Sequence, residues 1–144
     1  MFRKLLAAVD GSERGARVLA AALEIAERFD GTVHLYRAIE LPAEFPAAAA
    51  NRADLLRPHL ENKALEELRL LAAGHPRVIV EPPAVLHGRP WRDVLAAAEA
   101  LDVDLIVIGS HGYQGWDRLL GTNAGAIANR SQRNVLVVHG GAPK

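Results

Sequence analysis

Two short segments of the chain combine residue types that could bind a phosphate group. Residues 10–12 (Asp-Gly-Ser) and residues 109–112 (Gly-Ser-His-Gly) each follow directly on a run of apolar residues. Glycine allows a ligand to approach the backbone closely, and consecutive amides in such a turn can surround an anion. Residues 121–123 (Gly-Thr-Asn) would open a later helix, whose N-terminal amides also suit a phosphate. Asp10 could hold Mg²⁺ beside these amides, because this ion prefers carboxylate and phosphate oxygens.

Other interpretations of these residues stay open at this level. Gly109 and Gly112 could serve only as tight-turn residues, and the phosphate motifs GxxxxGKS/T and GxGxxG are not present in the sequence. A hydrolase could use Ser110 or His111, but neighbouring residues on one loop rarely point at each other, and the sequence has no GxSxG. The six histidines show no metal-ligand spacing, so a structural metal is not expected.

The surrounding sequence predicts five strands that alternate with four helices. The strands are expected at residues 5–9, 32–38, 77–85, 105–108 and 135–138, and the helices between Ser12 and Gly31, at 54–73, from Pro90 to Leu101 and at 123–131. Residues 40–53 show no period and are expected to form a long connection that could fold over a ligand. Because the strands are apolar on both faces, they predict a parallel sheet covered by helices on each side.

This arrangement would bring the two glycine-containing segments together. In an open parallel sheet, ligands bind outside the carboxyl ends of the strands, where the strand order reverses. If the first and fourth strands are central neighbours, residues 10–12 and 109–112 face one crevice.

Length and composition limit the classes of protein that fit. The 144 residues show no domain boundary, so residues 1–144 are expected to form a single domain. The chain has no cysteine, which excludes a disulfide scaffold and thiol catalysis. No apolar run approaches the length of a membrane span, and 17 basic residues balance 17 acidic ones. We therefore expect neither a membrane nor a nucleic acid as partner.

Four segments together make the chain resemble the universal stress proteins. These are residues 6–12 (LAAVDGS), 103–112 (VDLIVIGSHG), 119–124 (LLGTNA) and 134–138 (NVLVV). The resemblance implies an α/β, Rossmann-like fold: a doubly wound, five-stranded parallel sheet of order 3-2-1-4-5 with helices on both faces. ATP-binding members carry Gly-x2-Gly-x9-Gly-Ser/Thr, and here eight residues, 113–120, separate the second and third glycines, so the loop is one residue shorter.

The resemblance also implies a nucleotide site. Carried over position by position, its residues are Ala8, Val9, Asp10, Ala38, Ile108, Gly109, Ser110, His111, Gly112, Gly121, Thr122 and Asn123. Val9 and Ala38 would frame the adenine, residues 121–123 would hold the phosphates, and Asp10 would lie near the metal.

The function expected from the resemblance is that of a cytoplasmic stress-response protein that binds ATP, ADP or AMP with Mg²⁺. It would be a nucleotide-dependent regulator or a chaperone-like partner and at most a slow ATPase, with no residue assigned as catalytic. The apolar edge strand at residues 135–138 predicts a homodimer. The alternative is a dimeric interaction module that binds no nucleotide.

Overall fold

The computed structural model describes residues 1–41, 50–86, 89–110 and 123–139, with the backbone alone for residues 50–54. The strands are β1 (Lys4–Ala8), β2 (Thr32–Tyr36), β3 (Ala38–Glu40), β4 (Val78–Val80), β5 (Ala84–Leu86), β6 (Leu105–Gly109) and β7 (Asn134–Val138). The helices are α1 (Gly15–Phe29), α2 (Ala50–Ala72), α3 (Pro90–Ala100) and α4 (Asn123–Arg130).

The main sheet has five parallel strands in the order β4-β2-β1-β6-β7. A parallel α/β fold with five strands in this sheet was expected from the sequence. This order differs from the expected 3-2-1-4-5. The reason is that the structure has two additional described strands, β3 and β5, which shift the numbers of the strands that follow them. β3 and β5 pair in parallel with each other outside the main sheet.

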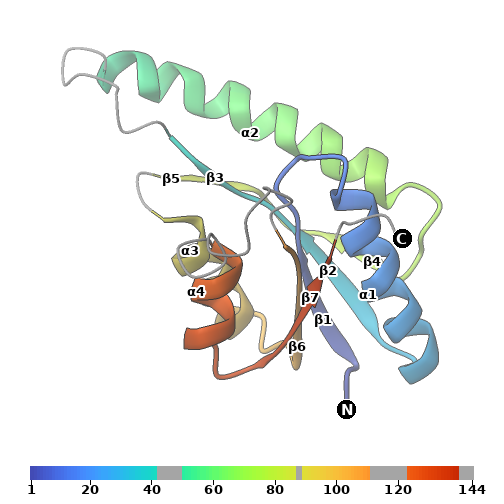
Figure 1. Ribbon diagram of the computed structural model, residues 1–144. Helices are drawn as coiled ribbons and strands as arrows, with labels where there is room; N and C mark the ends of the chain where they lie inside the picture. Colours follow the sequence, from blue (N-terminus) through green and yellow to red (C-terminus); the bar gives the residue numbers. More distant parts are fainter. Residues whose placement is uncertain (42–49, 87–88, 111–122, 140–144) are drawn as a thin grey trace.

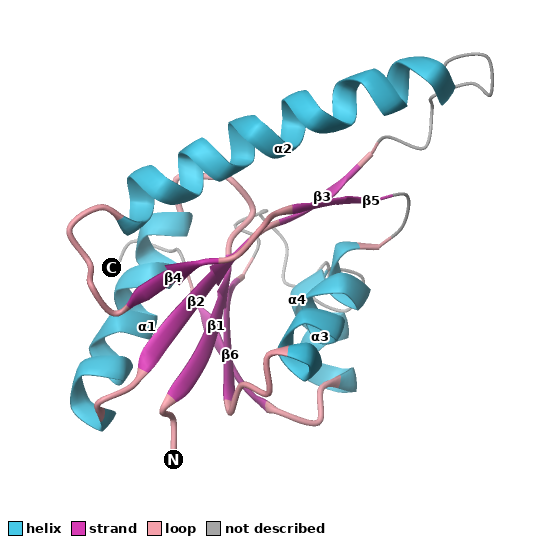
Figure 2. Cartoon of the chain, turned by 180° about the vertical axis from the view of Figure 1, so that it is seen from behind, coloured by secondary structure: helices cyan, strands magenta, loops and turns pink. Residues whose placement is uncertain are grey.

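β3 and β5 continue the outer pair of the main sheet beyond an interruption. Arg37 alone separates β2 from β3, whereas residues 81–83 (Glu-Pro-Pro) separate β4 from β5. Because proline has no amide hydrogen to donate to a neighbouring strand, the expected strand at 77–85 is interrupted and forms two strands. Figures 1 and 2 show the β3–β5 pair extending away from the main sheet beneath α2.

Each side of the sheet has its own apolar cluster. Leu5 and Ala7 of β1 pack with residues of α1 and with Leu68 of α2. Leu6, between them in β1, packs instead with Val94 of α3 and Ile127 of α4. Because successive side chains of a strand point to opposite faces, the two clusters lie on opposite sides of β1. Figure 2 shows α1 and α2 apart from α3 and α4.

Three helix ends differ from the prediction. The helix expected between Ser12 and Gly31 begins at Gly15 and has Arg14 in the N-cap position, where its amide donates to Ser12 Oγ at 3.3 Å. The left-handed residue after α1 is Asp30, with φ of 52°, rather than Gly31. α2 begins at Ala50, so residues 50–53 of the expected connection are helical and Pro58 lies inside the helix.

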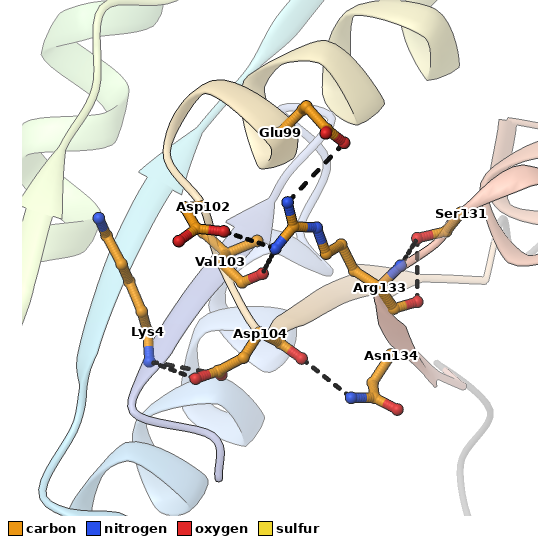
Figure 3. A network of polar contacts seen from close by, with 8 residues as sticks. All are labelled: Lys4, Glu99, Asp102, Val103, Asp104, Ser131, Arg133 and Asn134. Atoms are coloured by element: carbon orange, nitrogen blue, oxygen red, sulfur yellow. Dashed lines mark hydrogen bonds and ion pairs between the residues drawn. The ribbon is translucent and has the colours of Figure 1, made fainter.

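Polar contacts tie the loops together at the amino ends of the strands (Figure 3). Arg133 Nη1 donates to Asp102 Oδ1 at 2.8 Å and to the Val103 carbonyl at 3.0 Å. The hydrogen bond and charge of Arg133 hold the pKa of the Asp102 carboxyl below its usual value. Asn134 Nδ2 donates to the Asp104 carbonyl at 3.1 Å. These contacts join the turns that precede β6 and β7, at the edge where the two strands begin.

None of the helices in the described ranges, α2 included, has the length and apolar character needed to cross a membrane.

Candidate functional site

The carboxyl ends of β1 and β6 lie side by side, as the sequence predicted. Ala8 is paired in register with Ile108. The turns that follow the two strands begin with Val9, whose amide donates to the Tyr36 carbonyl, and Ser110, whose amide donates to the Val138 carbonyl, both at 2.9 Å. The main-chain bonds therefore fix the start of both turns to the neighbouring strands.

A cavity of about 110 Å³ opens at this edge of the sheet. Eight of the twelve residues predicted for the site line it: Ala8, Val9, Asp10, Ala38, Ile108, Gly109, Ser110 and Asn123. The other four, His111, Gly112, Gly121 and Thr122, lie outside the described residues, as does the short loop at 113–120. The structure thus brings together all the predicted residues that it describes.

Seven further residues line the cavity without having been predicted. They are Arg14, Gly15 and Val18 of the α1 region, Pro90 and Val94 of α3, and Ala124 and Ile127 of α4. Val18 and Val94 belong to apolar stripes at helical spacing, but the sequence does not show which end of the sheet each one meets. For Arg14, one feature of the sequence could have predicted a place in the site: it lies shortly after a strand that carries site residues.

The turn at Asp10 is shaped by its own hydrogen bond and by glycine. Asp10 Oδ1 accepts from the Ser12 amide at 2.9 Å, which is an Asx-type turn. Gly11 has φ of +82°, a left-handed conformation that glycine adopts at little cost. Asp10 and the residues at the start of α1, Arg14 and Gly15, all line the cavity.

Gly109 brings α1 close to β6 at the base of the cavity. A Cβ atom added at Gly109 would lie 3.2 Å from Val18 Cγ2. The absence of a side chain therefore has a packing reason as well as any reason connected with a ligand.

Contacts among α3, α4 and β2 hold the opposite wall. The Trp91 amide donates to Asn123 Oδ1 at 3.2 Å, so the N-terminal ends of α3 and α4 are joined next to the cavity. The Tyr36 hydroxyl donates to Asp93 Oδ2 in the first turn of α3. Burial of Tyr36, and then this hydrogen bond, raise the pKa of the phenol well above its ordinary value. Tyr36 therefore stays protonated and continues to donate to Asp93.

A model of the universal stress protein family matches residues 1–139 of this sequence. The chain belongs to the universal stress protein family. Universal stress protein A homolog 1 of Coxiella burnetii (strain RSA 493 / Nine Mile phase I) is 33% identical to it over 142 residues, which are 95% of this chain and 96% of that protein. The sequence resemblance is therefore confirmed at the level of the family.

Solved structures of universal stress proteins have the same fold. The crystal structure of one in complex with cAMP matches with a TM-score of 0.70 and 26% identity, over 96% of this chain and 98% of that one. The hypothetical protein MJ0577 matches with a TM-score of 0.78 and 22% identity over 99% of each chain, a likeness that concerns the fold.

The described part of this universal stress protein offers a metal ion few ligands. No group of three or more His, Asp or Glu side chains lies close enough together to hold a metal ion within the described ranges. Mg²⁺ is usually bound in proteins by one or two carboxylates together with substrate phosphates and water. Asp10 alone therefore fits Mg²⁺ only if a phosphate-bearing ligand supplies further oxygens.

Proposed function

We propose that this universal stress protein binds an adenine nucleotide, ATP, ADP or AMP, together with Mg²⁺. One observation carries the proposal. Eight residues selected from separate sequence motifs, and located in β1, β3, β6, α4 and the turns between them, line the same cavity. The likeness to a universal stress protein in complex with cAMP, itself an adenine nucleotide, supports it further.

The chemistry of the cavity wall suits a base joined to a polar group. Val9, Val18, Val94 and Ile108 provide the apolar surface that a stacked or enclosed base requires. Polar groups are contributed by Asp10, Ser110 and Asn123. In this proposal the amides of residues 121–123 and the Thr122 hydroxyl bind phosphate, as do the turn residues His111 and Gly112. Asp10 holds Mg²⁺ together with the phosphate oxygens.

The proposed role is that of a nucleotide-dependent regulator or chaperone-like partner in the cytoplasm. We assign no catalytic residue, so any ATPase activity is slow. We propose that residues 1–144 form one domain and that two copies associate through β7, which lies at one end of the main sheet. The alternative is an interaction module that binds no nucleotide, and the shorter loop at residues 113–120 is the feature that favours it.

Calorimetric titration with ATP and Mg²⁺, with AMP and cAMP in parallel, tests the proposal. We expect saturable heat and a rise in melting temperature for at least one nucleotide. A variant that fills the cavity, Ala38→Phe, should lose the binding. Ala84→Phe is the matched control, because Ala84 is the cross-strand partner of Ala38 in β5 and does not line the cavity. No heat and no thermal shift at millimolar nucleotide would favour the interaction module instead.

A further inference from the structure

Arg14 is a charged residue of the cavity wall at the start of α1. It precedes the first residue of α1, is partly buried, and lines the cavity next to Gly15. Among the described lining residues, Asp10 and Arg14 are the two whose side chains carry a charge at neutral pH. Arg14 therefore supplies the positive charge of a wall that is otherwise apolar, neutral or acidic.

The guanidinium of Arg14 has no acidic partner within the described chain. The arginines at positions 28, 37, 77 and 133 all form ion pairs there, whereas Arg14 forms none. The nearby Asp10 carboxylate accepts instead from the Ser12 amide. A guanidinium that has lost part of its water to an apolar wall is stabilised by an anion that accepts its hydrogen bonds.

The position of Arg14 at the start of α1 also favours binding of an anion. The N-terminal end of a helix carries partial positive charge, so a cation there is unfavourable and an acidic residue would be favourable. α1 has no acidic residue in its first turn. The helix end and the Arg14 guanidinium therefore add their positive potentials at one side of the cavity. Helix stability alone would favour an acidic residue rather than an arginine at this position.

We infer that Arg14 binds a phosphate of the ligand and makes this site selective for phosphorylated nucleotides over the nucleoside. The inference rests on the proposed function, since it concerns the same cavity. Arginine presents a planar set of donors that matches two phosphate oxygens at once, an arrangement that lysine does not reproduce. The phosphate would lie between Arg14 on one side and the amides at the start of α4 on the other. Both elements contribute lining residues to the cavity.

Titration of the full chain with ATP, AMP and adenosine, for the wild type and three variants, tests the inference. We expect Arg14→Gln to weaken ATP and AMP by about 10-fold or more, the range for a hydrogen bond to a charged group. Adenosine affinity should stay within about twofold of the wild type. Arg14→Lys should retain part of the affinity for the nucleotides. Arg17→Gln is the matched control, because Arg17 is exposed, belongs to the same helix and does not line the cavity.

The outcomes separate this inference from the function on which it rests. Equal weakening of ATP, AMP and adenosine by Arg14→Gln would show that the residue only supports the cavity wall. Nucleotide binding unaffected by Arg14→Gln would overturn the inference and leave the proposed function standing. Failure of the wild type to bind any of the three ligands would overturn both. Circular dichroism of each variant confirms that the fold is retained.

Discussion

The guanidinium of Arg37 lies directly against Gly11. A Cβ atom added at Gly11 would be 2.5 Å from Arg37 Cζ, and the same guanidinium donates to Glu67 Oε2 of α2 at 2.6 Å. Arg37 belongs to the junction between β2 and β3. One side chain thus connects the turn that contains Asp10 to α2, although the three segments are far apart in the sequence.

The first prediction concerns Gly11→Ala. Gly11 and Gly74 have almost the same backbone conformation, with φ of +82° and +80°, but nothing lies within 4 Å of a Cβ at Gly74. Gly74→Ala should therefore cost only the left-handed backbone strain, about 1–2 kcal/mol of unfolding free energy. Gly11→Ala should cost about 1 kcal/mol more, because Arg37 must move and give up its ion pair with Glu67. Urea unfolding of both variants measures the difference.

An Arg37→Ala background provides the control for this comparison. With the guanidinium removed, Gly11→Ala should cost no more than Gly74→Ala. If the extra cost persists in that background, the contact between Arg37 and Gly11 does not cause it.

The second prediction concerns the ion pair itself. The side chains of Arg37 and Glu67 are 21% and 42% exposed, so the pair is only partly screened by solvent. We expect Glu67→Gln to lower the unfolding free energy by about 0.5–1 kcal/mol at low salt and by less at high salt. Glu24→Gln removes a 3.6 Å pair with Arg28 whose side chains are more than two-thirds exposed, and should have no measurable effect. An equal loss in both variants would contradict this ranking.

The third prediction concerns alkaline pH. Because burial raises the pKa of Tyr36, the folded state resists its ionisation. The stability gained from neutral Tyr36 is fully present below the pKa of an unfolded tyrosine, about 10, and is lost as pH rises above it toward the raised value. Tyr36→Phe should abolish this part of the alkaline destabilisation. It should also cost about 1–2 kcal/mol at neutral pH through the lost bond to Asp93.

Urea unfolding at neutral and alkaline pH, together with tyrosinate absorbance, measures both effects. A wild type and a Tyr36→Phe variant that lose stability in parallel as pH rises would show that another group causes the alkaline loss.

The fourth prediction tests the proposed homodimer. β7 and β4 are the two ends of the main sheet, and both carry apolar residues there. Lysine at Val135 and Val137 should release monomers in light scattering, because the charges would meet their copies across a twofold axis. Ile79→Lys, in β4, is the matched control and should leave the assembly unchanged. Since Val135 and Val137 also pack against the core, circular dichroism must first show that the variant is folded. A dimer that survives both β7 substitutions does not use this strand.

Sequence motifs predicted the two strand ends of the site well, because strand-ending glycines and an acidic turn are local features. Asp10, Gly109 and Ser110 meet at one cavity for this reason. Arg14 could not be predicted in the same way, since its approach to the cavity depends on where α1 begins and how it is rotated. The contact of Arg37 with Gly11 is likewise a tertiary relationship that no spacing along the chain reveals.

The errors at element boundaries also have physical causes. Gly31 was expected to close the helix that follows Ser12, but Asp30 is the residue that takes the left-handed conformation there, and Gly31 packs against the backbone of Arg3. A Cβ at Gly31 would lie 2.7 Å from the Arg3 carbonyl oxygen, so the requirement for glycine there is close approach rather than backbone conformation. Pro58 is compatible with a longer α2 than the sequence indicated, despite the hydrogen bond that proline removes.

The interruption at Glu81–Pro83 divides the protein into parts that need not open together. Only two main-chain bonds bracket it, from the Glu81 amide to the Leu35 carbonyl and from the Ala84 amide to the Arg37 carbonyl. Because the hydrogen-bond ladder is interrupted at this point, local unfolding of the β3–β5 pair need not spread to the β2–β4 pair. The amides of β3 and β5 should exchange with solvent deuterium before those of β2 and β4. Because Ala38 of β3 lines the cavity, opening of the β3–β5 pair would expose one part of the cavity wall while the five strands of the main sheet stay paired.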